Sequence, residues 1–266
     1  MKYCGAGVFF ELKMTINWCK IIKLIRFLCQ GELSMEKGSK NNIEYDVKEE
    51  SWQLYSCLYK DAIGKIDFNK DVKNNNRRSI ETSFTHNGKS VRLNMSGETD
   101  FNFSEKKVFG LSCSRIEHYE KYLNKLPNKE KYLEQLERCK KKHHSQQNIS
   151  LMPQTGNFQG VKKHIGNDRL DTFVWALNEY YLRNNYLLFN FSSFDNLPII
   201  KQYLDIFGGV NDYCKSIYFI EEKLVTDLIV SGKKPIDSPE RVIEYMNLAE
   251  EFWKQKDIYI SSVTNV

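Results

Sequence analysis

The dipeptide Asn87-Gly88 constrains the fold most, because it lies between two runs in which apolar and polar residues alternate. A two-residue type I′ turn needs positive φ at both central positions, which asparagine and glycine tolerate best. A hairpin closed there makes three predicted pairs: Phe84 with Val91, Thr82 with Leu93 and Ile80 with Met95. One face of this hairpin is apolar and the other polar, as in an antiparallel sheet covered on one side.

The remaining apolar residues recur mostly at helical spacing. A third strand is expected in residues 101–112, and little regular structure between residues 145 and 167. Helices are expected at about 52–62, 116–126 and 132–139, from near Asp168, from about 197 to Gly208 or Gly209, up to Gly232, and from Ser238 onward. The sequence therefore predicts an α+β fold, in which a small antiparallel sheet (hairpin at about 80–95) is packed by a mostly α-helical C-terminal part.

Residues 1–34 differ from the rest of the chain. Their apolar stretch is interrupted by basic residues, so no uncharged run reaches the roughly 18–20 residues of a membrane span, and no signal-peptide cleavage site follows. Codons for Gln30–Glu32 can contain a ribosome-binding sequence just before Met35, which favours a translated leader. A disordered or amphipathic N-terminal extension is the alternative. We expect residues 35–266 to form a single α+β domain.

Charge and cysteines limit the class of protein. The chain carries 39 basic and 34 acidic residues, and much of the excess lies in residues 1–34. In the remaining residues, positive and negative charges nearly balance, so this part of the chain lacks the excess positive charge that binds nucleic acid. Any contact with nucleic acid must therefore be local. Four widely spaced cysteines remain outside the leader (Cys57, Cys113, Cys139 and Cys214). Without CxxC pairs or a secretion signal, they indicate a reduced, cytoplasmic protein.

The stretch "CKKKHH" contains the most concentrated positive charge. The candidate basic patch consists of Lys140, Lys141, Lys142, His143 and His144. At a helix C-terminus these side chains stabilise the negative end of the dipole, and a local contact with phosphate is the alternative. Cys139 and His143 share a helical face, but no second ligand pair completes a zinc site. We therefore expect no metal and no cofactor.

Two further stretches bear on chemistry. Glu221 to Lys223 resembles the end of a nuclease Asp…Glu-x-Lys set, with Asp195 or Asp212 as the distant acid, although the tripeptide reads as a helix start. The loop before Asp168 is long, basic and rich in glycine, and such loops are often functional. The candidate pocket there consists of Asn157, Lys162, Asp168, Arg169 and Asp171. A purely structural start to the helix is the leading interpretation, because acidic residues in its first turn repel anions, and the pocket is the alternative.

Several segments in residues 150–256 resemble, in order, an uncharacterised bacterial domain-of-unknown-function family. They are "MPQTGNFQG", "GNDRLDTFVWALNEYY", "YLDIFGGVNDYC", "EKLVTDLI" and "YMNLAEEFWKQK". The matching positions are Pro153, Gly156, Asn157, Asp168, Arg169, Asp171, Leu204, Phe207 and Tyr213. The resemblance implies bacterial origin and one continuous domain, and it supplies no catalytic residue.

No Walker loop, GxGxxG, GxSxG, HExxH or EF-hand pattern occurs in the sequence. The leading hypothesis is a cytoplasmic binding or interaction protein with an unknown protein or small-molecule partner. The alternative is a nucleic-acid-directed, metal-dependent nuclease-like enzyme or effector, for example in phage defence, that uses the basic patch. That alternative requires the patch and at least two acids to line one groove.

Overall fold

A computed structural model describes residues 49–66, 79–106, 114–154, 158, 162, 168–183 and 197–264. The predicted leader, Cys113, Asn157 and Asp195 lie outside these residues. Helices and strands follow one another in the order α2 (Glu49–Leu58), β1 (Ile80–His86), β2 (Lys89–Thr99), α3 (Arg115–Leu123), α4 (Lys129–Lys142), η3 (Gln146–Asn148), β3 (Ile149–Pro153), α6 (Leu170–Arg183), α7 (Leu197–Leu204), α8 (Val210–Ile217), α9 (Glu222–Gly232) and α10 (Pro239–Thr264). This is the α+β arrangement that the sequence predicts.

The predicted hairpin is confirmed in turn and in register. Asn87 and Gly88 have φ angles of 48° and 72°, and all three predicted pairs occur between β1 and β2. The prediction of a third strand in residues 101–112 is wrong for its described part, because residues 101–106 form no strand. The third strand is β3, which pairs antiparallel with β2 from Met95↔Pro153 to Thr99↔Ile149. Every residue of β3 is buried, so no alternation marked it in the sequence.

The helices begin and end for identifiable reasons. Ser114 and Glu117 form a capping box at the start of α3, and Ser238 Oγ accepts from Arg241 N–H at the start of α10. The helix predicted from about 197 is present as α7, but its predicted end at Gly208 or Gly209 is wrong, because α7 ends at Leu204. Gly209, with φ of 156°, is instead the N-cap of the unpredicted α8.

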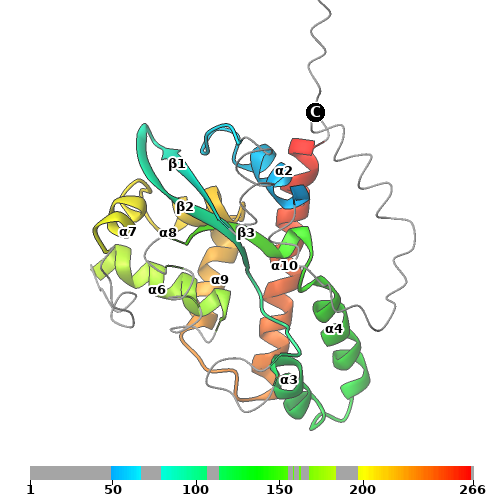
Figure 1. Ribbon diagram of the computed structural model, residues 1–266. Helices are drawn as coiled ribbons and strands as arrows, with labels where there is room; N and C mark the ends of the chain where they lie inside the picture. Colours follow the sequence, from blue (N-terminus) through cyan, green and yellow to red (C-terminus); the bar gives the residue numbers. More distant parts are fainter. Residues whose placement is uncertain are drawn as a thin grey trace, which may run out of the picture.

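Helix α10 is the packing partner of four other described α-helices. It packs against α2, α3, α4 and α9, and Figure 1 shows it running beside the sheet. Aromatic side chains fill the space between it, α3 and the segment after β2: Phe101, Phe103, Tyr119, Tyr245, Phe252 and Trp253. Across the described ranges, no helix has both the length and the apolar character that crossing a membrane requires.

Candidate functional site

The structure brings four residues of the predicted pocket together in the interior. Lys162 Nζ lies 2.9 Å from Asp168 Oδ1, and Arg169 donates two hydrogen bonds to Asp171, at 3.0 and 2.5 Å. All four side chains are at least nine-tenths buried as residues. Burial alone would lower the pKa of Lys162, but the neighbouring carboxylates raise it above its usual value. The lysine therefore stays charged as one half of a buried ion pair.

Other protein groups contact the same carboxylates. Asn102 donates to Asp168 at 2.5 Å, and Ser231 donates to Asp171 at 2.7 Å. These contacts connect the start of α6 to the end of β2 and to α9. The contacts expected from the leading interpretation, a structural start to the helix, are thus present. The pocket itself stays a prediction, because Asn157 and most of its loop lie outside the described residues.

The candidate basic patch does not form one charged surface. Lys140 pairs with Glu105 and Glu137, whereas Lys141 and Lys142 are exposed on α4. Burial and the adjacent His144 lower the pKa of His143 to about 4, and its Nδ1 accepts from Phe103 N–H at 3.2 Å. A neutral, inward-facing imidazole contributes no positive charge to a phosphate contact at pH 7.

Acids near this patch are already paired. Lys142 lines a hollow of about 360 Å³ together with Glu250 and Asp257. Glu250 accepts from Arg138 at 3.1 Å, and Asp257 accepts from Gln147 at 2.8 Å. Among the described residues, no group of three or more His, Cys, Asp or Glu side chains is placed to hold a metal ion.

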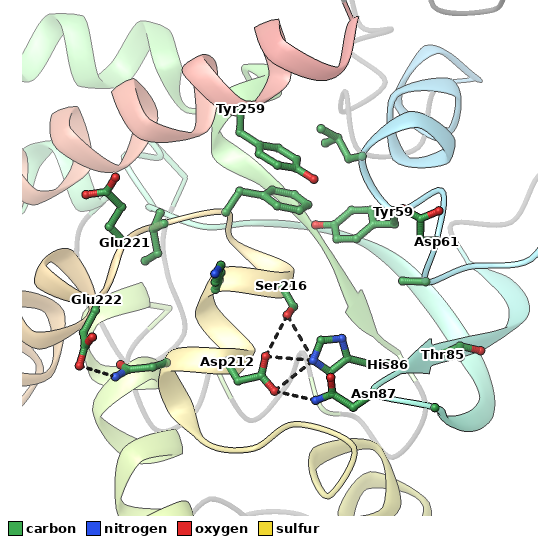
Figure 2. A pocket seen from close by; sticks show the side chains of 17 residues that line it. Tyr59, Asp61, Thr85, His86, Asn87, Asp212, Ser216, Glu221, Glu222 and Tyr259 are labelled. Atoms are coloured by element: carbon green, nitrogen blue, oxygen red, sulfur yellow. Dashed lines mark hydrogen bonds and ion pairs between the residues drawn. The ribbon is translucent and has the colours of Figure 1, made fainter. Parts of the chain in front are cut away.

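A larger hollow of about 1070 Å³ lies elsewhere, and among its lining residues the sequence had pointed only to Asp212, Glu221 and Glu222, as part of a possible nuclease set. Four segments line it: the end of α2 and the turn after it, the β1–β2 turn, α8 with the turn that follows, and the last part of α10 (Figure 2). Its main side chains are Tyr59, Asp61, His86, Asp212, Lys215, Ser216, Phe219, Glu221, Glu222 and Tyr259. We call it the α2–α8–α10 cavity.

Aromatic side chains form one wall of the α2–α8–α10 cavity. The rings of Phe219 and Tyr259 stack with their centres 4.1 Å apart and an angle of 7° between their planes. The centre of the Tyr59 ring lies 5.1 Å from that of Phe219. Phe219 has φ of 58°, which is rare for a bulky residue and costs free energy that neighbouring contacts must offset. Tyr59 is fixed by donating to Ile217 O at 2.7 Å. The wall is therefore held in place before any ligand arrives.

His86, Asp212 and Ser216 meet at the opposite side of the cavity (Figure 2). Both carboxylate oxygens of Asp212 lie 3.0 Å from His86 Nε2, and Ser216 Oγ lies 3.5 Å from the same nitrogen. A serine–histidine–aspartate relay needs the acid on one ring nitrogen and the serine on the other. This geometry is therefore not that of a catalytic triad.

Asp212 instead anchors the β1–β2 turn to the start of α8. It accepts from Gly208 N–H at 2.7 Å and from Asn87 Nδ2 at 3.1 Å. Although burial would raise its pKa, the hydrogen bonds from Gly208 and His86 hold the pKa of Asp212 below its usual value. The carboxylate is therefore ionised and adds negative charge to the cavity.

The balance of charge in the α2–α8–α10 cavity is negative. Asp61, Glu221 and Glu222 are exposed at its rim, and Lys215 is the lining lysine. Burial and the nearby Asp61 raise the pKa of Tyr259, which places that carboxylate within electrostatic reach of the aromatic wall. The hypothetical nuclease acids Asp212 and Glu221 do share this cavity, but Glu222 begins α9 and does not lie on a strand.

No protein-family model, curated protein or solved structure matches this chain.

Proposed function

We propose that the protein is a binding protein whose α2–α8–α10 cavity accepts a ligand carrying an ammonium or guanidinium group. The observation that carries the proposal is the aromatic wall of Tyr59, Phe219 and Tyr259 in one cavity with the rim carboxylate Asp61. Aromatic faces attract cations through their quadrupole, and the attraction strengthens as the cation is desolvated. Carboxylates at the rim add longer-range attraction that speeds association.

The same charge opposes the nucleic-acid alternative at this cavity, since phosphate is repelled by an acidic rim. The basic patch offers little in its place, because Lys140 is paired with acids and the partly buried His143 is uncharged at pH 7. We therefore place the binding hypothesis ahead of a nuclease-like effector. A reduced, cytoplasmic location belongs to the proposal, supported by the free thiols Cys57, Cys139 and Cys214. A bacterial origin, which the resemblance implies, also remains part of the proposal.

The test is binding of a fluorescein-labelled Lys-Gly repeat peptide to the full chain, followed by fluorescence anisotropy. We expect Asp61→Asn and Tyr259→Leu each to weaken binding about ten-fold, corresponding to ~1.4 kcal/mol. Glu137→Gln is the matched control, since it removes an exposed carboxylate from α4, away from the cavity. Displacement by spermidine at similar concentration would identify a small polyamine as the ligand type, and failure to displace would indicate a polypeptide.

Equal binding of the matching Glu-Gly peptide, or equal affinity of all variants, would contradict the proposal. Labelled RNA and DNA at two salt concentrations, with and without magnesium, test the alternative. Binding that falls steeply with salt and is lost in Lys141→Gln/Lys142→Gln would place the nucleic-acid function first.

A further inference from the structure

Arg115, the first residue of α3, is a buried residue whose guanidinium has two nitrogen atoms without a hydrogen-bonding partner among the described residues. Its residue exposure is 4%, and within the described chain neither Nε nor Nη2 has an acceptor. A buried charge left unpaired strongly destabilises a folded protein. Each such group in a folded protein needs an explanation, and an ion bound at the site is one of the standard explanations.

Two tyrosines whose hydroxyls also lack a partner among the described residues interact electrostatically with Arg115. Tyr119 follows it by one turn on α3, and the Tyr119 ring is 6.0 Å from that of Tyr245 on α10. Both hydroxyls are buried and have no partner in the described part of the molecule. Burial raises the pKa of Tyr119 to about 12, while Arg115 and Arg169 act in the opposite direction. The hydroxyl is therefore protonated, can donate a hydrogen bond, and lies within the field of the two guanidinium groups.

Neighbouring charges leave Arg115 as the excess cation of this region. The Arg169 guanidinium carbon lies 5.7 Å from the centre of the Tyr245 ring, but Asp171 neutralises Arg169 through two hydrogen bonds. Asp168, the other nearby acid that acts on Tyr119, is paired with Lys162. Among the described residues, no carboxylate accepts a hydrogen bond from Nε or Nη2 of Arg115.

We propose that Arg115, Tyr119 and Tyr245 form a buried binding site for a phosphate-type oxyanion, between α3 and α10. Arginine presents Nε and one terminal nitrogen as a fork that matches two oxygens of phosphate or carboxylate. The two tyrosine hydroxyls supply further donors, which suits a tetrahedral anion with additional oxygens better than a carboxylate with two. The site is separate from the α2–α8–α10 cavity, because Tyr245 precedes Tyr259 by roughly 21 Å along the axis of α10.

The site is tested by thermal unfolding and calorimetry of the full chain with sodium phosphate, sulfate or acetate at constant ionic strength. We expect phosphate to raise the Tm of the wild type and to release heat of binding. Arg115→Met should abolish both responses. Arg138→Met is the matched control, because it removes an arginine from the surface, where Arg138 pairs with Glu250; it should leave both responses unchanged.

Tyr119→Phe and Tyr245→Phe keep the proposal testable if Arg115→Met fails to fold. Each removes one buried hydroxyl that has no partner among the described residues, so the ligand-free variant should be at least as stable as the wild type. Each should nevertheless bind phosphate about five- to ten-fold more weakly, as expected for one lost hydrogen bond. Equal phosphate responses in the wild type and these variants would overturn the site. A response to acetate alone would overturn the phosphate-type ligand.

Discussion

His143 lies immediately after α4, where its Nδ1 accepts a hydrogen bond from the Phe103 backbone at 3.2 Å. That bond requires an unprotonated Nδ1, and burial together with His144 lowers the pKa of the ring from 6.5 to about 4. An unfolded chain therefore binds more protons than the folded one between these two pH values. Stability from the neutral ring is complete above pH 6.5 and is lost as pH falls toward 4.

The predicted consequence is a pH-dependent loss of stability that disappears in His143→Asn. Asparagine keeps an acceptor near the position of Nδ1 but does not titrate. We expect urea unfolding to show about 2 kcal/mol less stability for the wild type at pH 4 than at pH 7, in excess of the change in the variant; partial exposure of the ring reduces the full value. Parallel pH profiles for the two proteins would contradict this origin of the effect.

For the basic patch, the sequence predicted that a helix ends there. It did not indicate which side chains face solvent and which face the interior. The run from Lys140 to His144 predicted a helix end, and α4 does end at Lys142. Whether each side chain faces solvent or the interior depends on contacts with distant segments, here the backbone at Phe103 and the acid Glu105. The separate charges of the patch were therefore visible in the sequence, whereas their burial and pairing were not.

Elements that a few adjacent residues specify were predicted well, whereas elements that depend on contacts with distant segments were missed. The Asn87-Gly88 turn fixes both the hairpin and its register through two positive φ angles. Strand β3 has no such local signal. All five of its residues are buried, so its sequence lacks the alternation of apolar and polar residues that marks a strand with one exposed face. Helix α8 was missed since Gly208 and Gly209 read as an end, whereas Gly209 caps a second helix.

Gly232, the last residue of α9, provides a test of how closely α6 and α9 pack. A Cβ at this position would lie 2.2 Å from the carbonyl oxygen and 2.6 Å from the carbonyl carbon of Asp171, so the backbones of α6 and α9 approach closely there. We predict that Gly232→Ala destabilises the protein by about 3 kcal/mol, since backbone atoms cannot yield as a flexible side chain would. The measurement is the midpoint and slope of urea unfolding.

Gly64→Ala is the matched control for this substitution. The nearest atom to its Cβ would be Thr82 Oγ1 at 3.7 Å, an ordinary contact. Its change in stability should stay within about 1 kcal/mol. If both variants lose the same stability, loss of glycine flexibility, and not the approach of α6 to α9, determines the cost at Gly232.

Across the whole molecule, both sites depend on residues that are far apart in the chain. The α2–α8–α10 cavity joins Tyr59, His86, Phe219 and Tyr259, and the proposed oxyanion site joins Arg115 with Tyr245. Each of these residues has an ordinary local role as a helix stripe or a turn neighbour. Without long-range pairing information, the sequence could indicate a core and a hairpin, but it could not indicate which aromatic and charged side chains meet.

The same long-range assembly is held by a buried ion pair between α10 and the end of β2. Lys256 Nζ lies 2.9 Å from Asp100 Oδ2, and Ser150 donates to the same carboxylate oxygen at 2.8 Å. Removing one partner leaves the other charge buried without its counterion, which costs about 3–5 kcal/mol. Removing both eliminates that unpaired charge. The double variant should therefore lose less stability than the sum of the two single variants.

We predict that Lys256→Met and Asp100→Asn each destabilise the protein by about 3 kcal/mol or more, and that the double variant recovers at least ~1 kcal/mol relative to additivity. Urea unfolding of all four proteins gives the coupling free energy. Lys254→Met is the control on the same helix, because that lysine is exposed and its loss should cost less than about 0.5 kcal/mol. Strict additivity of Lys256→Met and Asp100→Asn would show that each residue acts through other contacts, such as the bond from Lys256 to Ile149 O, and that the charge pair does not hold α10 to the sheet.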